Sequence, residues 1–180
     1  GVRPNGMTLI GGTSTCLLGL SEEEFHVDGV NGTYPNCMYD GTSLLEGGQT
    51  AAGSILTWFK NNLLPAAWMQ EAVNRNMNIY DLITEKASAV PIGCDGLVMM
   101  DYFQGNRAPY ADSKARGMFW GLSIGTTPAH LARAVYEGVA YGANHCIVSM
   151  KKAGYDVKEI YACGGLAQSD FWMQMHADII

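Results

Sequence analysis

Two glycine-rich turns contain the residues best suited to binding a phosphate group. The first is Gly12-Thr13-Ser14, where glycine lets a ligand approach the backbone and two hydroxyl groups can donate hydrogen bonds. The second is Gly164-Gly165, between a predicted strand and a predicted helix. The amino end of a helix presents free N–H groups and a positive dipole end, which favour phosphate. Each turn is also compatible with a purely structural role, as a tight hairpin or a tight strand–helix connection, and for the hairpin the local pattern alone favours that role.

The titratable side chains form no recognisable catalytic or metal-binding pattern in the sequence. Three histidines fall among apolar residues of predicted helices, where we expect packed or surface side chains: His130, His145 and His176. Glu137 lies in the longest predicted helix, and a buried carboxylate there requires a partner. Asp95 and Asp101 flank a predicted strand, where a carboxylate can act as a base, but the sequence identifies no partner for either.

Composition excludes several classes of protein. The 180 residues are 48% hydrophobic and only 16% charged, below the roughly 25% that is typical of soluble domains. This scarcity of charge suggests that part of the surface faces another domain or subunit. A net charge of −6 argues against a nucleic-acid-binding protein. No apolar run approaches the ~20 residues of a membrane-spanning helix.

The cysteines indicate the redox compartment of the protein, and the two ends of the chain indicate whether the sequence is a fragment. Five cysteines, an odd number without a CxxC pair, predict reduced thiols in a cytoplasmic protein. The chain begins at Gly1 without a methionine and ends at Ile180 inside a predicted helix. We therefore expect a piece of a longer protein, truncated at both ends.

An α/β order of elements positions the two glycine-rich turns. A β-hairpin is predicted first, and short strands and loops follow it up to Leu45. The Gly47-Gly48 pair is expected to mark the start of the first helix. Strands are predicted at Met7–Ile10, Thr15–Leu20, Gly96–Met100 and Glu159–Cys163. Helices are predicted at Thr50–Asn62, after Pro65, at Ile79–Ala89 with Asn78 as cap, from Thr127 to about Lys152, and after the cap Ser169.

The longest predicted helix contains a ridge of small residues. Ala134, Gly138 and Gly142 are spaced four apart and therefore lie on one face of the helix. The two glycines lower helix propensity by roughly 1 kcal/mol each. We expect a neighbouring helix or strand to approach this ridge closely, because close packing can offset that loss.

Several motifs, in order along the chain, resemble those of the FGGY family of carbohydrate kinases. Gly117–Leu122, then seven residues and His130-Leu131, then two residues and Ala134–Glu137, resemble the second signature of this family. The Gly12-Thr13-Ser14 turn is similar to the phosphate hairpin of the family. Further stretches are similar to pentulose-kinase, loop and adenosine motifs: Glu46–Gly53, Gly105–Pro109 and Gly164–Ile179.

The resemblance implies an RNase-H-like domain of the sugar kinase, Hsp70 and actin superfamily, with a mixed sheet flanked by helices. Residues 1–180 would be the C-terminal, nucleotide-side domain, and the N-terminal sugar-binding domain would be absent. The implied activity is the phosphorylation of a small sugar or polyol by ATP with Mg²⁺, and the implied sugar is a ketopentose such as ribulose or xylulose. A homodimer is a further expectation from the family.

The resemblance also assigns roles to single residues. Gly12, Thr13 and Ser14 would contact the ATP phosphates. Further residues would lie along the nucleotide and hold the adenosine, namely Gly53, Thr57, Gly164, Gly165 and Ser169. The catalytic aspartate would lie upstream of Gly1, because residues 1–10 contain no acidic side chain. The chain alone would then be inactive, and two other readings stay open: a non-catalytic nucleotide-binding module and an interaction domain that binds no nucleotide.

Overall fold

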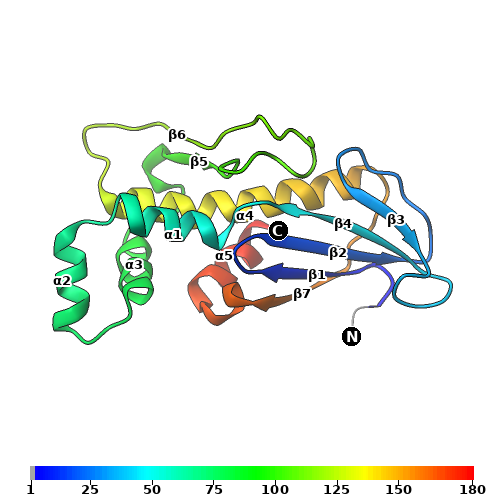
Figure 1. Ribbon diagram of the computed structural model, residues 1–180, viewed down its shortest axis with the longest axis horizontal. Coiled ribbons are helices and arrows are strands. Elements are labelled where there is room, and N and C mark those ends of the chain that lie inside the picture. Colours follow the sequence, from blue (N-terminus) through cyan, green and yellow to red (C-terminus); the bar gives the residue numbers. More distant parts are fainter. Residues whose placement is uncertain (1–2) are drawn as a thin grey trace.

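A mixed five-stranded sheet forms one end of the molecule, as the computed structural model of residues 3–180 shows (Figure 1). The strands are β1 (Gly6–Gly11), β2 (Thr15–Ser21), β3 (Asn31–Pro35), β4 (Ser43–Gln49) and β7 (Glu159–Gly164). Their order in the sheet is β3-β4-β2-β1-β7, with β7 parallel to β1 and the other neighbours antiparallel. The predicted mixed sheet in an α/β fold is therefore confirmed.

The register of the hairpin follows from the alternation of apolar residues. Leu9 of β1 faces Leu17 of β2, and both side chains are buried in the core together with Leu45 of β4. Side chains on one face of adjacent strands pack as cross-strand pairs, and a slip by one residue would expose them. The predicted hairpin is confirmed at nearly its predicted bounds.

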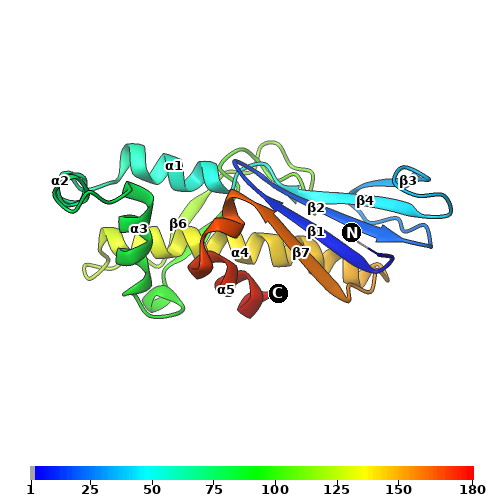
Figure 2. The same cartoon turned by 90° about the horizontal axis from the view of Figure 1, so that it is seen from below.

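Five helices accompany the sheet: α1 (Gly53–Asn62), α2 (Ala66–Asn74), α3 (Ile79–Ser88), α4 (Pro128–Lys152) and α5 (Asp170–Ile179). The predicted caps are present, since the Asn78 side chain accepts the Tyr80 N–H and Thr127 forms a capping box with His130. Helix α4 runs along the molecule, with its amino end beside α3 and its carboxyl end behind the sheet (Figure 2). None of the helices described within residues 3–180 is long and apolar enough to span a membrane.

A second, two-stranded sheet packs against the small residues of α4, which confirms the close approach of a strand predicted for this ridge. This sheet pairs β5 (Val98–Met100) with β6 (Met118–Trp120). A Cβ atom on Gly138 would lie 2.5 Å from the carbonyl oxygen of Met99, and one on Gly142 would lie 2.5 Å from an oxygen of Asp101. A larger residue at position 138 would displace the backbone of β5, and one at position 142 would displace the side chains of Gln49 and Asp101.

Two predictions about the elements need correction, and one strand was missed. Gly47 and Gly48 do not begin a helix, because they pair with β2 as part of β4, and the helix begins only at Gly53. The predicted strand at Gly96–Met100 is shorter and buries only Met99 within β5. Strand β6 was not predicted at all, since three residues are too few to show a strand period.

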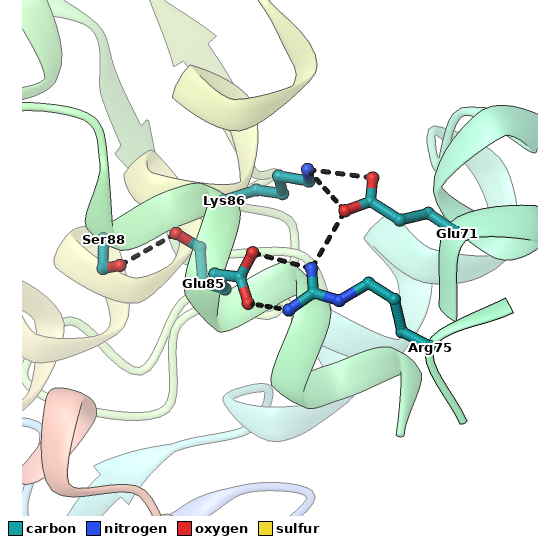
Figure 3. A network of polar contacts seen from close by, with 5 residues as sticks. All are labelled: Glu71, Arg75, Glu85, Lys86 and Ser88. Atoms are coloured by element: carbon teal, nitrogen blue, oxygen red, sulfur yellow. Dashed lines mark hydrogen bonds and ion pairs between the residues drawn. The ribbon is translucent and has the colours of Figure 1, made fainter. Parts of the chain in front are cut away.

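An ion-pair network joins α2 to α3 at the far end of the molecule (Figure 3). Arg75 contacts Glu71 at 2.9 Å and Glu85 at 2.7 Å, and Lys86 contacts Glu71 at 2.9 Å. The side chains of all four residues are partly exposed. The network positions α2 beside α3, which in turn borders the site described next.

Candidate functional site

A cavity of about 860 Å³ opens where the β1–β2 hairpin, α1, α3 and the turn before α5 converge. It brings together segments that are far apart in the sequence and includes the tips of both glycine-rich turns. The residues that the site uses are Gly12, Thr13, Gly53, Ser54, Thr57, Tyr80, Asp81, Thr84, Tyr136, Gly165, Gln168, Ser169, Phe171 and Trp172.

The hairpin tip is fixed to the first turn of α1 by three backbone hydrogen bonds. The Gly53 N–H donates to the Gly12 carbonyl at 3.0 Å, and the N–H groups of Ala52 and Ser54 donate to the Thr13 carbonyl at 2.9 and 3.1 Å. The first N–H groups of α1 are thus already used, and they are not free for a phosphate. A ligand at this point would meet the exposed tip of the hairpin, where Thr13 and Ser14 present their hydroxyl groups.

The second glycine-rich turn lies beside the first because β7 is parallel to β1, so that Gly164 pairs with Gly11. Gly164 has a φ of +89°, and a Cβ atom there would lie 2.5 Å from the Gly11 carbonyl oxygen. Only glycine fits both conditions. Gly165 then enters the cavity wall, and the Ser169 hydroxyl caps α5 by accepting the Trp172 N–H at 3.3 Å.

Aromatic side chains form the wall opposite the hairpin. The Tyr136 ring lies edge-to-face against Trp172 and Phe171, with centroids 5.0 and 5.3 Å apart. The Tyr136 hydroxyl lies 2.8 Å from the Thr84 hydroxyl, and burial raises the pKa of Tyr136 to about 12. Because the Thr84 proton goes to the Tyr80 carbonyl at 2.8 Å, Tyr136 is the donor in this pair. These aromatic side chains are therefore neutral at physiological pH and form an apolar part of the cavity wall.

The structure places six of the eight predicted site residues in one cavity wall: Gly12, Thr13, Gly53, Thr57, Gly165 and Ser169. The Thr57 hydroxyl lies 3.2 Å from the Tyr80 hydroxyl and donates to the Gly53 carbonyl at 3.3 Å. Two predicted residues are not in the wall. Ser14 lies on the exposed hairpin tip next to it, and Gly164 serves the close contact between β1 and β7.

Sequence reasoning missed the aromatic wall and its polar neighbours. Tyr80 and Thr84 are four apart in α3, directly after the cap Asn78, and that spacing places them on one helix face. Tyr136 lies inside the signature stretch that was identified. The sequence shows that these aromatic and hydroxyl residues are present, but it does not show which helix face borders a cavity. That depends on the packing of α3, α4 and α5.

The carboxylates singled out in the sequence, Glu137, Asp101 and Asp95, have partners and lie outside the cavity wall. Glu137 is buried and accepts from Arg133 Nε at 2.6 Å and from the Gly93 N–H at 3.2 Å, which confirms a buried, paired carboxylate. Asp101 is buried and accepts from Gln49 Nε2 at 2.7 Å, and burial raises the pKa of Asp101. Asp95 lies 3.2 Å from His130. Neither aspartate is positioned as a base for a ligand in the cavity.

The other two histidines are accounted for by packing. His145 lies edge-to-face against Tyr110, with centroids 5.3 Å apart. His176 is buried, its Nδ1 lies 2.8 Å from the Trp172 carbonyl oxygen, and burial lowers the pKa of this imidazole. Within residues 3–180, no three His, Cys, Asp or Glu side chains are grouped so that they could hold a metal ion.

Comparison with known proteins shows the family to which the chain is related. Residues 7–180 match the FGGY family of carbohydrate kinases, C-terminal domain. The chain is 34% identical over 178 residues to the ribulokinase of Bacillus licheniformis and 35% identical over 177 residues to that of Halalkalibacterium halodurans. In both comparisons 98% of the chain is aligned, and the chain spans about a third of each relative, 32% and 31%.

A solved structure shows the same fold. The xylulose kinase from Rhodospirillum rubrum superposes with a TM-score of 0.80 at 28% identity, over 98% of this chain and 33% of that protein. The relatives are carbohydrate kinases, and the RNase-H-like fold of the sugar kinase superfamily is confirmed. By sequence and by structure, this chain belongs to the FGGY family of carbohydrate kinases and matches its C-terminal domain.

Proposed function

We propose that this chain is the nucleotide-binding, C-terminal domain of an ATP-dependent sugar kinase whose substrate is a ketopentose. The observation that carries the proposal is the cavity between the two glycine-rich turns. Its volume of about 860 Å³ falls in the range of roughly 300–1,000 Å³ that is usual for small-molecule sites. It combines exposed donors at one end with an aromatic wall at the other, as a nucleotide requires.

Each end of the cavity suits one part of ATP. At the hairpin, Gly12, Thr13 and Ser14 would contact the phosphates through the exposed backbone and the hydroxyl groups. Gly53 and Thr57 would lie along the nucleotide, where the helix approaches the hairpin. These assignments are supported by the fixed geometry of the tip, which three hydrogen bonds to α1 hold in place before any ligand arrives.

The cavity wall formed by the second glycine-rich turn and α5 would hold the adenosine. Gly165, beside the hairpin, lines this wall without a side chain, Ser169 fixes the start of α5, and Gly164 holds the turn against β1. The rings of Tyr136, Phe171 and Trp172 supply an apolar surface against which a purine can pack.

The metal would not be held by this chain alone. Mg²⁺ is usually bound through one or two carboxylates together with substrate phosphates and water, so it would accompany the triphosphate. When bound, it neutralises charge on the phosphates during transfer. This chain would contribute orientation, because the hairpin tip and the neighbouring Gly164-Gly165 turn are both held by backbone contacts and would limit the positions that a bound triphosphate can take.

The longer protein would supply the remaining half of the reaction. In this proposal a preceding sugar-binding domain provides the carboxylate that accepts the proton of the sugar hydroxyl. Closure of the two domains would exclude water, which competes as the phosphoryl acceptor. The protein's relatives include ribulokinases and a xylulose kinase, and these names support a ketopentose as the acceptor.

The test is a phosphorylation assay on the longer protein with ATP, Mg²⁺ and a panel of ribulose, xylulose, ribitol and glycerol. The proposal predicts ADP release that depends on a pentulose. Release with none of the acceptors, alongside measurable ATP binding, would instead favour the non-catalytic nucleotide-binding module. Failure to bind ATP as well would favour an interaction domain.

A further inference from the structure

A second cavity lies behind the aromatic wall of the candidate nucleotide cavity, between α4 and α5, which run side by side in both ribbon views (Figure 1, Figure 2). Its volume is about 230 Å³, and the α4 residues Arg133 and Glu137 line it. Phe171 of α5 lines both cavities. The Phe171 ring therefore forms part of the partition between the nucleotide cavity and a buried pair of charges.

Arg133 covers the Phe171 ring from the side of the second cavity. The guanidinium carbon lies 5.1 Å from the ring centroid, which is within the range of a cation–π contact. Arg133 lines the second cavity and not the first. The cation therefore occupies one face of the ring, and the side of the ring away from Arg133 borders the candidate nucleotide cavity.

A buried carboxylate holds Arg133 in this position. The Arg133 Nε donates to Glu137 Oε1 at 2.6 Å, and only 7% and 5% of the two side chains are exposed. The same oxygen accepts the Gly93 N–H at 3.2 Å. A buried ion pair adds little net stability, because both charges lose their water. The contact with Phe171 gives this pair a use other than stability.

The Phe171 ring depends on packing for its orientation, because it has no polar atom. Its neighbours are fixed by hydrogen bonds, since Trp172 Nε1 donates to the Tyr136 carbonyl at 3.2 Å and the Tyr136 hydroxyl pairs with Thr84. Phe171 itself meets Tyr136 edge-to-face, and Arg133 covers one face of its ring. Without the guanidinium that face would lose its partner, and the ring could turn into the second cavity.

We propose that Arg133 is a positioning residue for the base of the nucleotide, because it holds the Phe171 ring where a purine packs against it. The proposal rests on the function proposed above and adds to it the residue that sets the preference for the base. The two fused rings of a purine cover more of an aromatic surface than the single ring of a pyrimidine does, so a fixed wall favours ADP over UDP. A ring that is free to turn loses this preference.

The test compares the dissociation constants of ADP and UDP, which differ only in the base, by calorimetric titration of the protein. The wild type should bind ADP about tenfold more tightly than UDP, and Phe171→Leu should reduce this ratio to about threefold or less. Arg133→Met combined with Glu137→Gln should reduce it equally. This double variant leaves no buried charge unpaired, and the amide oxygen at position 137 can still accept the Gly93 N–H.

The ratio separates positioning from a general loss of structure, which would weaken both nucleotides alike. Because Arg133 acts through Phe171, adding Phe171→Leu to the double variant should lower the ratio no further. The matched control is Arg75→Met with Glu71→Gln. It removes a pair with the same spacing of four residues from α2, outside the cavity wall, and should keep the wild-type ratio.

A measurement on the wild type keeps the proposal falsifiable if the double variant does not fold. The NMR signal of the Arg133 Nε–H, which is buried in its bond to Glu137, should shift when ADP is added and shift less with UDP. A wild-type ratio near one, an unchanged ratio in Phe171→Leu or in the double variant, an equal loss in the control, or an Arg133 signal that ADP leaves in place would overturn this proposal alone. A protein that binds neither nucleotide would overturn the proposed function as well.

Discussion

The amide nitrogen of Gly53 lies 3.0 Å from the carbonyl oxygen of Gly12, so the start of α1 is bonded directly to the tip of the β1–β2 hairpin. A Cβ atom at position 53 would lie 2.5 Å from the same oxygen. This close approach, and not contact with a ligand, explains why position 53 requires glycine. It also joins the two elements that would hold opposite sides of a nucleotide.

The first prediction concerns this contact. Gly53→Ala should push α1 away from the hairpin, destabilise the fold by about 1–3 kcal/mol as overpacking does, and weaken ATP binding about tenfold. Urea unfolding and calorimetric titration measure the two effects. Gly125→Ala is the control, because the nearest atom to its added Cβ lies 3.6 Å away. Equal behaviour of the two variants would contradict the proposed coupling.

The second prediction concerns the hydroxyl pair in the aromatic wall. Tyr136 and Thr84 lie 2.8 Å apart at a largely buried point. A double-mutant cycle of Tyr136→Phe and Thr84→Val should give a coupling free energy of about 0.5–1.5 kcal/mol in urea unfolding. The more exposed pair of Thr57 and Tyr80, at 3.2 Å, should couple more weakly. A coupling near zero for Tyr136 and Thr84 would show that this bond is absent in solution.

The third prediction is a loss of stability at alkaline pH. The Tyr155 hydroxyl is buried and donates to the Gly6 carbonyl at 2.6 Å, and burial raises the pKa of Tyr155 from 10 to about 12. The folded state therefore resists ionisation, so this contribution is complete below pH 10 and is lost as pH rises towards 12. Between these values one such tyrosine changes the free energy of unfolding by roughly 1.4 kcal/mol per pH unit.

Urea unfolding of Tyr155→Phe from pH 8 to 11 tests this account. The variant should be less stable at pH 8, because the Gly6 carbonyl loses the hydroxyl that donates to it, but its stability should fall less steeply above pH 10. Tyr39→Phe is the control, since Tyr39 is largely exposed. A slope above pH 10 identical to that of wild type would be the contrary result.

The fourth prediction concerns the ion pairs between α2 and α3 (Figure 3). Hydrogen bonds from Lys86 and Arg75 lower the pKa of Glu71, and one from Arg75 lowers that of Glu85. Their stabilisation is present above the ordinary carboxyl pKa and is lost as pH falls below it. Because the pairs are exposed, Arg75→Gln should change global stability little and loosen α2 locally.

Hydrogen exchange of the α2 amides measures this loosening. Protection factors, which compare each exchange rate with the intrinsic rate at the same pH, should fall for α2 in Arg75→Gln, and in wild type at high salt or at pH 3, while α4 stays protected. Lys114→Gln, at an exposed loop position, should behave as wild type. Unchanged exchange in Arg75→Gln would show that the network does not hold α2.

Local signals account for what could be predicted from the sequence. Asn78, Thr127 and Ser169 are caps whose chemistry is set by near neighbours, and the hairpin follows from alternation within a few residues. Strand β6 could not be predicted, because Met118–Trp120 is too short to show a period and forms only against β5. The prediction that Gly47-Gly48 begins a helix was wrong for a similar reason, because these residues form a strand only by pairing with β2.

The candidate site divides in the same way. The two glycine-rich turns could be found because glycine and hydroxyl residues cluster in the sequence. The aromatic wall could not, because Tyr80, Tyr136 and Phe171 come from three helices whose facing sides are decided by long-range packing. Contacts across the fold are also needed to see why two of the glycines are present. Gly53 allows α1 to approach the hairpin closely, and Gly164 allows β7 to approach β1 closely.

The central claim is that the cavity binds an adenine nucleotide, and an ADP titration of protein labelled with ¹⁵N at glycine tests it most directly. The account predicts that the amide signals of Gly12, Gly53 and Gly165 shift together with one dissociation constant, whereas those of Gly41 and Gly125, outside the cavity wall, stay in place. Saturating ADP that leaves the three cavity glycines unmoved, or that shifts only glycines elsewhere, would contradict it.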